Sequence, residues 1–115
     1  MPLSRKDEQI IKHLIDYCKE VDLAIATFKA DKSQFIKDPV FRNACSMPIM
    51  QIGELAKNLS EEFQNSNQHI PWQAIKGMRN LFAHDYHSMD SEMIWETATV
   101  SIPDLSKKLT AILCK

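Results

Sequence analysis

The chain contains only two glycines and five prolines among 115 residues. Tight hairpin turns depend heavily on glycine, so this composition argues against a sheet made of hairpins and favours helices. The first nine residues lack the apolar run of a signal peptide, and no uninterrupted apolar stretch has the length needed to cross a bilayer. These absences predict a cytoplasmic protein that has no membrane partner.

The three cysteines, Cys18, Cys45 and Cys114, are odd in number and far apart, and none belongs to a C-x-x-C pair. This spacing indicates neither a disulfide framework nor a zinc site. We therefore expect reduced thiols, two of them on the apolar faces of helices.

The net charge is −1, with 14 basic and 15 acidic side chains. A nucleic-acid-binding protein usually carries a basic patch or stripe. Any such surface must therefore be local, or must form when two chains come together. The length fits one domain, residues 1–115, with a single hydrophobic core.

Apolar residues recur at helical spacing in four long stretches. The first helix is predicted over residues 4–28, and the second begins where Asp38 caps the helix and Pro39 takes its first position. The polar segments Lys29–Lys37 and Glu61–His69 are predicted to be links. The apolar positions are Ile11, Leu14, Cys18, Val21, Ile25 and Phe28 in the first helix, and Phe41, Ala44, Pro48, Ile52, Leu55 and Leu59 in the second.

The third helix is predicted to begin at Pro71, and the fourth follows Asp90 as its cap. A proline ring clashes with the carbonyl four residues before it, so Pro48 should kink or split the second helix and Pro103 should bend the fourth. The predicted fold class is all-α, an antiparallel up-and-down four-helix bundle, with five helices if Pro48 or Pro103 splits one. The fourth helix is lined by Met93, Ile94, Ala98, Ile102, Leu105, Leu109, Ile112 and Leu113.

The segment Trp72–Asp90 places polar groups on a stretch that otherwise has the pattern of a buried helix. Arg79, His84 and Tyr86 form the pattern R-x4-H-x-Y near the end of this helix. A helix that only filled a core would not carry so many hydrogen-bonding groups at one end, because burying them costs free energy unless each finds a partner. The end of the third helix is therefore the predicted functional site. Its apolar positions are Ile75, Met78, Leu81 and Phe82.

R-x4-H-x-Y at the end of a helix is the signature of the HEPN superfamily, and the chain resembles its HepT-like toxin branch over nearly its whole length. The resemblance implies a metal-independent ribonuclease that acts as a homodimer, with the Arg–His motif at the interface. It also implies a cognate MntA-like nucleotidyltransferase antitoxin, which attaches AMP to the motif tyrosine, here Tyr86. The matching stretches are IGELAK at Ile52–Lys57, Pro71–Trp72 and GMRNLFAHDY at Gly77–Tyr86.

The residues themselves suit this chemistry. RNA cleavage without a metal needs a base for the 2′-hydroxyl proton, an acid for the leaving 5′-oxygen and cationic donors for the charged phosphorane. Histidine suits both proton transfers because its pKa lies near neutral pH, and arginine matches the phosphate oxygens. One chain supplies one motif histidine, His84, and one motif arginine, Arg79. A two-fold dimer would supply two of each, and no cofactor is required.

Three residues are predicted to support this pair. Asn80 precedes His84 by four residues and so shares its helix face, and Asp85 is adjacent in sequence. Glu54 is predicted to pair with or orient Arg79, because placing an arginine near a core costs less free energy when its charge is paired. The alternative for Glu54 is a satisfied hydrogen bond inside the bundle or an exposed flank.

Helix geometry leaves an alternative for the motif pair. Positions five apart differ by about 140°, so Arg79 and His84 do not share a face unless Arg79 reaches around or the helix ends near Ala83. Otherwise Arg79 bonds a carboxylate within the bundle and His84 caps a helix C-terminus. Tyr86 has an alternative too, in which its ring packs on the bundle and its hydroxyl hydrogen-bonds outward.

Two further alternatives concern the whole protein. His84, Asp85 and His87, with His69, could ligate zinc, although the set lacks a compact fourth ligand, and no metal is expected. The chain could also be a non-catalytic dimeric module that serves a separately encoded nucleotidyltransferase. The sequence does not discriminate this module from a ribonuclease, because both would keep the same fold and interface.

Overall fold

The computed structural model describes residues 3–27, 31–84 and 90–114, and it contains no strand in these ranges. This confirms the predicted all-α class. The elements are α1 (Arg5–Thr27), α2 (Lys32–Lys37), α3 (Pro39–Ala56), α4 (Glu61–Ser66), α5 (Trp72–His84), α6 (Ser91–Glu96), the π-helical turn η2 (Thr97–Ser101) and α7 (Ile102–Leu113).

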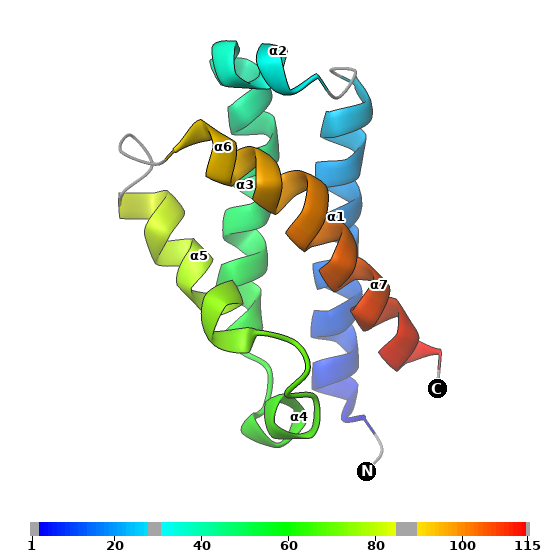
Figure 1. The fold of residues 1–115 in the computed structure, drawn as a ribbon. Helices are drawn as coiled ribbons and strands as arrows, with labels where there is room; N and C mark the ends of the chain where they lie inside the picture. Colours follow the sequence, from blue (N-terminus) through cyan, green and yellow to red (C-terminus); the bar gives the residue numbers. More distant parts are fainter. Residues whose placement is uncertain (1–2, 28–30, 85–89, 115) are drawn as a thin grey trace.

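The long helices alternate in direction (Figure 1). α1 and α3 lie side by side and antiparallel, and α5 packs along α3. The arm formed by α6, η2 and α7 crosses over both, with α6 on α3 and α7 on α1. None of the helices in the described ranges is long and apolar enough to span a membrane.

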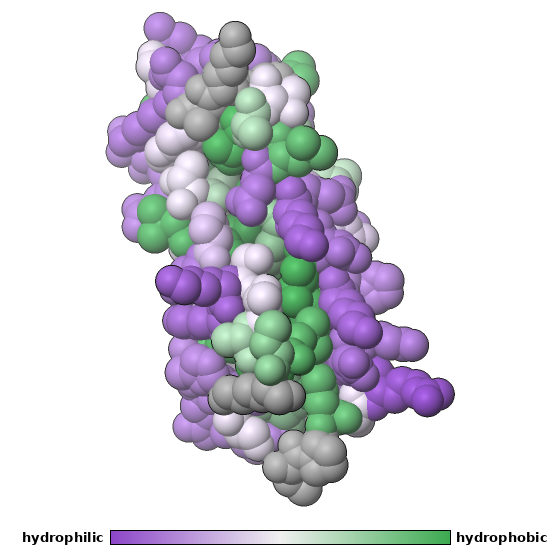
Figure 2. Space-filling model, turned by 90° about the vertical axis from the view of Figure 1, so that its right-hand side faces the viewer, coloured by the Kyte–Doolittle hydropathy of each residue, from purple (hydrophilic) through white to green (hydrophobic). Residues whose placement is uncertain are grey.

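The core contains the apolar seam predicted for the first helix. Ile11, Leu14, Cys18 and Val21 are fully buried, and Ile25 is half-buried. Phe28, the last position of the predicted seam, lies outside the described residues. On the face at the right of Figure 1, apolar residues form a strip between hydrophilic flanks, so the core reaches the surface there (Figure 2).

The prediction that residues 29–37 form only a polar link is wrong, because α2 occupies the last six of them. Asp31 caps α2 by accepting hydrogen bonds from the N–H groups of Ser33 and Gln34. Phe35 is fully buried, with its ring centroid 4.8 Å from that of Phe41 and 5.2 Å from that of Trp95. A single apolar side chain therefore anchors this short helix.

The second predicted link contains a helix for the same reason. Ser60 caps α4 by accepting from the N–H of Phe63, and the Phe63 ring lies 5.7 Å from that of Trp72. Asp7 of α1 accepts hydrogen bonds from the N–H and the hydroxyl of Ser60, at 2.9 and 2.6 Å. These contacts tie α4 to both α5 and α1.

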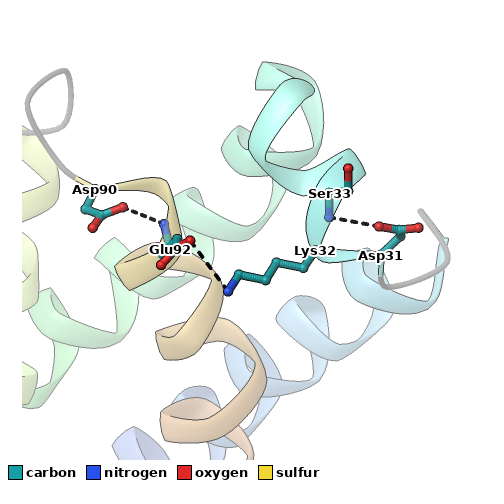
Figure 3. Close-up of polar contacts among 5 residues, drawn as sticks. All are labelled: Asp31, Lys32, Ser33, Asp90 and Glu92. Atoms are coloured by element: carbon teal, nitrogen blue, oxygen red, sulfur yellow. Dashed lines mark hydrogen bonds and ion pairs between the residues drawn. The ribbon is translucent and has the colours of Figure 1, made fainter.

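The arm begins at Asp90, which caps α6 as predicted by accepting from the N–H of Glu92 at 2.9 Å. An ion pair between Lys32 and Glu92, at 3.7 Å, links α2 to α6 (Figure 3). Both side chains are more than half exposed, so the pair contributes less than about 1 kcal/mol to stability.

The two helix prolines behave differently from each other. α3 continues through Pro48, so of the two predicted outcomes, a kink or a split, the split does not occur. Pro103 is the second residue of α7, which begins directly after the π-helical turn. A proline ring crowds the carbonyl four residues before it, and the wider π turn gives that carbonyl room. The last predicted helix is thus interrupted ahead of Pro103.

All three cysteines are free, and Cys18 and Cys45 are buried as predicted. Burial raises the pKa of the Cys18 thiol to about 12, with a smaller contribution from the nearby Asp22. Burial raises the pKa of Cys45 to about 11. Both thiols therefore stay protonated and unreactive at neutral pH.

Candidate active site

The helix that carries the motif, α5, is anchored at its first residue. Trp72 is buried, and its indole N–H donates a 3.1 Å hydrogen bond to the carbonyl of Asn67. Farther along the helix, Ile75 and Phe82 are buried, while Met78 and Leu81 are half-buried. The apolar positions predicted from spacing therefore face the core, and their burial sets the rotation of α5 about its axis.

Arg79 is turned toward α3, where it forms an ion pair with Glu54. The distance between Arg79 Nε and Glu54 Oε2 is 3.1 Å, and the side chains are 35% and 52% exposed. Glu54 also contacts Lys57, with its Oε2 3.7 Å from Lys57 Nζ. At this exposure the pair adds little stability. Its main effect is to orient the guanidinium, and such a pair is expected of a catalytic arginine and of a structural one alike.

Asn80 and His84 lie on a different side of the same helix. Both are exposed, and their spacing of four residues puts them on one face. α5 continues through Ala83 to His84, so His84 keeps a helical position about 140° around the axis from Arg79. The structure brings Arg79 together with Glu54 and aligns Asn80 with His84, but the arginine and the histidine of one chain point in different directions.

The remaining predicted site residues, Asp85 and Tyr86, lie outside the described residues, as does His87 of the zinc alternative. Over residues 3–27, 31–84 and 90–114, no group of three or more His, Cys, Asp or Glu side chains could hold a metal ion. His69 is exposed just before α5.

Lys76 extends the polar face of α5 by one more turn. It precedes Asn80 by four residues, and its Nζ donates a 2.9 Å hydrogen bond to Gln64 Oε1 of α4. Lys76, Asn80 and His84 thus form a line along the helix, which is the kind of local polar surface that a chain with a net charge of −1 would need to contact a phosphate backbone.

A groove of about 420 Å³ lies on another side of α5. Its walls include Ile75 and Met78 from α5, and Val100 and Leu105 from η2 and α7. None of the predicted catalytic and supporting residues that the structure describes lines it; these are Arg79, His84, Asn80 and Glu54. The groove is therefore separate from the part of the motif that the structure describes.

Gly53, the neighbour of Glu54, was not predicted as a functional residue. It is buried in α3 and touches the backbone of Arg79. A signal was present in the sequence, since the chain has only two glycines and a glycine within a helix is unfavourable by about 1 kcal/mol relative to alanine. Such a residue usually has a packing reason.

Comparison with known proteins identifies the class to which this fold and this motif helix belong. The family described as Ribonuclease HepT-like matches residues 8–112. A relative from Caldanaerobacter subterraneus subsp. tengcongensis is 33% identical over 105 residues, which cover 91% of this chain and 92% of the relative. A relative from Methanocaldococcus jannaschii is 29% identical over 92 residues, covering 80% and 79%. Both are named as putative RNases.

A third relative, from Thermococcus cleftensis, is named as a probable ribonuclease HepT and is 35% identical over 74 residues, covering 64% of this chain and 67% of the relative. No solved structure matches the chain significantly. The all-α fold and the family match define an RNA-cleaving enzyme. The chain belongs to the HepT-like ribonuclease family, which confirms the resemblance seen in the sequence.

Proposed function

We propose that this ribonuclease is the toxin of a toxin–antitoxin pair, a metal-independent endoribonuclease whose active site forms between two copies of the chain. Arg79 and His84 are the proposed catalytic residues. The observation that carries the proposal is their separation around α5: Glu54 holds Arg79 toward α3, whereas His84 is exposed at the end of the helix. A second copy facing the first across α5 would supply a second histidine and a second arginine to one site.

In the proposed reaction, His84 of one copy takes the proton of a ribose 2′-hydroxyl, whose oxygen attacks the adjacent phosphorus. The bond from phosphorus to the 5′-oxygen breaks, and His84 of the other copy donates a proton to that oxygen. The products are a 2′,3′-cyclic phosphate and a free 5′-hydroxyl. The guanidinium of Arg79 stabilises the additional negative charge on the phosphorane.

The supporting residues have distinct proposed roles. Glu54 keeps Arg79 in one orientation through the 3.1 Å ion pair. Asn80 shares the exposed face of His84 and would donate an amide hydrogen bond to a phosphate oxygen. Asp85 follows His84 directly and is proposed to orient the imidazole. Pairing of two chains would double the polar face of α5 that includes Lys76.

The proposed partner is an MntA-like nucleotidyltransferase antitoxin that attaches AMP to Tyr86, as the family resemblance implies. Tyr86 follows His84 by two residues, so the added phosphate would compete with RNA for Arg79 and the adenosine would obstruct the site. The activity and its control are proposed to take place in the cytoplasm, where RNA and the antitoxin would both be present.

Cleavage assays with matched variants test the proposed mechanism. His84→Ala and Arg79→Ala should each reduce RNA cleavage by about a hundredfold or more, while the circular dichroism spectrum stays helical. His13→Ala and Arg5→Ala are suitable controls, because both residues are exposed on α1 and should tolerate replacement. Cleavage should persist in EDTA and leave 2′,3′-cyclic ends. Full activity in either motif variant, or loss of activity in EDTA, would contradict the mechanism. A purified chain that binds a nucleotidyltransferase but cleaves no RNA would favour the non-catalytic module.

A further inference from the structure

α3 and α5 approach each other closely at Gly53. A Cβ atom placed on Gly53 would lie 2.7 Å from the backbone nitrogen of Arg79 and 2.8 Å from the carbonyl oxygen of Ile75. It would also lie 3.2 Å from the Cβ of Arg79. Ordinary van der Waals contacts of a Cβ begin at 3.4 Å, so any side chain at this position requires a shift of the structure.

The atoms that such a Cβ would meet belong to the backbone of α5. In an α-helix, the N–H of residue 79 donates to the carbonyl of residue 75, so Gly53 packs directly on the helical turn that carries Arg79. A flexible side chain could move aside, but a helix backbone moves only as a unit. Alanine at position 53 would therefore displace the turn from α3.

Glu54, the next residue of α3, contacts the side chain of the same arginine. Two consecutive residues of α3 thus act on Arg79, with Gly53 against its backbone and Glu54 on its guanidinium. In the part of the chain that the structure describes, α3 is also the element on which α5 packs most extensively. The position of Arg79 therefore depends on how α5 packs against α3.

We propose that Gly53 is a positioning residue of the active site, which seats the Ile75–Arg79 turn against α3 so that Glu54 can orient Arg79. For its effect on catalysis, this inference rests on the proposed role of Arg79. Misplacement of a catalytic group by about 1 Å can lower a rate by about a hundredfold. The space left by the missing Cβ is therefore a determinant of activity as well as of packing.

The chain offers a matched control in its other glycine. Gly77 lies on α5, two residues before Arg79, and a Cβ placed on it would have no atom of another described element within 4 Å. Gly77→Ala adds the same methyl group as Gly53→Ala, but at this position the methyl group contacts no other described element. Alanine is also the better helix former, so Gly77→Ala should melt at the same or a higher temperature than the wild type.

Nuclear magnetic resonance of the Arg79 side chain tests the positioning without reference to activity. In Gly53→Ala, the Nε–H resonance of Arg79 should move toward its position in Glu54→Gln, where the ion pair is removed. In Gly77→Ala it should stay at the wild-type position. An unchanged Arg79 resonance in a folded Gly53→Ala protein would overturn the proposal, whether or not the wild type cleaves RNA.

Cleavage kinetics well below the melting temperature test the consequence. Gly53→Ala should lower kcat by about ten- to a hundredfold with little change in KM, and Gly77→Ala should leave both unchanged. The effect of Gly53→Ala should be much smaller in an Arg79→Lys background, because a residue that acts through Arg79 is not additive with it. Additive effects in the double variant would assign Gly53 a purely structural role.

If Gly53→Ala alone does not fold, the double variant Gly53→Ala/Gly77→Ala provides the second measurement, since the alanine on α5 adds helix propensity. A folded double variant with a displaced Arg79 resonance supports the proposal. A double variant that still fails to fold would make Gly53 a requirement of the fold and would contradict a specific role in positioning Arg79.

Discussion

The guanidinium of Arg79 on α5 and the carboxylate of Glu54 on α3 form an ion pair with a 3.1 Å separation between Nε and Oε2. The two residues are 25 positions apart in the sequence and meet because α3 and α5 pack closely at Gly53. Both side chains remain partly exposed. The pair therefore holds an arginine at the surface, where it can still meet a substrate.

The pair leads to a first prediction. Glu54→Gln should lower the cleavage rate by about tenfold, because Arg79 loses the charge that orients it, while the free energy of unfolding should change by less than about 1 kcal/mol. Glu20→Gln, at an exposed position of α1, serves as the control and should leave the rate unchanged. Single-turnover kinetics measure the cleavage rate, and chemical denaturation measures the free energy of unfolding. A wild-type rate in Glu54→Gln would show that Glu54 has no role in the active site.

A second prediction concerns the homodimer. Light scattering at micromolar concentration should give the mass of two chains. Ala83→Glu should yield monomers and abolish cleavage, because a charged side chain on the exposed part of α5 beside His84 would be buried in the proposed interface. Ala26→Glu, at an exposed position of α1, should remain dimeric and active. A wild-type monomer that cleaves RNA at full rate would refute the shared site.

A third prediction concerns Tyr86. Co-expression with the antitoxin should raise the intact mass of the chain by one or more AMP units, and the modification should map to Tyr86. Tyr86→Phe should escape enzymatic neutralisation while keeping some cleavage activity. Tyr17→Phe replaces the other tyrosine, which is half-buried on α1, and should still be modified. An unmodified Tyr86 in a fully neutralised complex would mean that the antitoxin inhibits by binding alone.

A fourth prediction concerns the pH dependence of stability. Asp7 is only 3% exposed, and burial alone would raise its pKa. Hydrogen bonds from the hydroxyl and the N–H of Ser60, together with smaller contributions from Ser4 and the charge of Lys6, outweigh burial and lower the pKa below its ordinary value. A carboxyl group whose pKa is lower in the folded state stabilises the protein above its unfolded pKa. This stabilisation is lost as the pH falls through the folded pKa.

Thermal melts from neutral pH to pH 2 should therefore show a loss of stability in acid that depends on Asp7. Asp7→Asn should destabilise the protein at neutral pH by about 1–3 kcal/mol, because Ser60 loses its charged acceptor. The stability of this variant should also fall less steeply than that of the wild type as the pH is lowered. Asp16→Asn, exposed on the same helix, should leave the melting curve at neutral pH unchanged. Equal acid sensitivity in Asp7→Asn would rule out this carboxylate as a source of the pH dependence.

The sequence by itself determined the features that repeat within one or two helical turns. The seam from Ile11 to Val21 and the apolar face of α5 follow from residues three and four apart, and the core buries them as the spacing requires. Asp90 acts as a cap because a carboxylate next to a helix start accepts the first free N–H groups. The motif R-x4-H-x-Y could be recognised for the same reason, since its three residues fall within eight consecutive positions of the sequence.

Only the tertiary structure decided the features that depend on residues far apart in the chain. α2 and α4 form within polar segments because Phe35 packs on Phe41 and Trp95, and Phe63 packs on Trp72. The contact of Gly53 with the Arg79 turn depends on how closely two helices approach. Local spacing describes one helix at a time, whereas burial and close approach are set by the partner against which each helix packs.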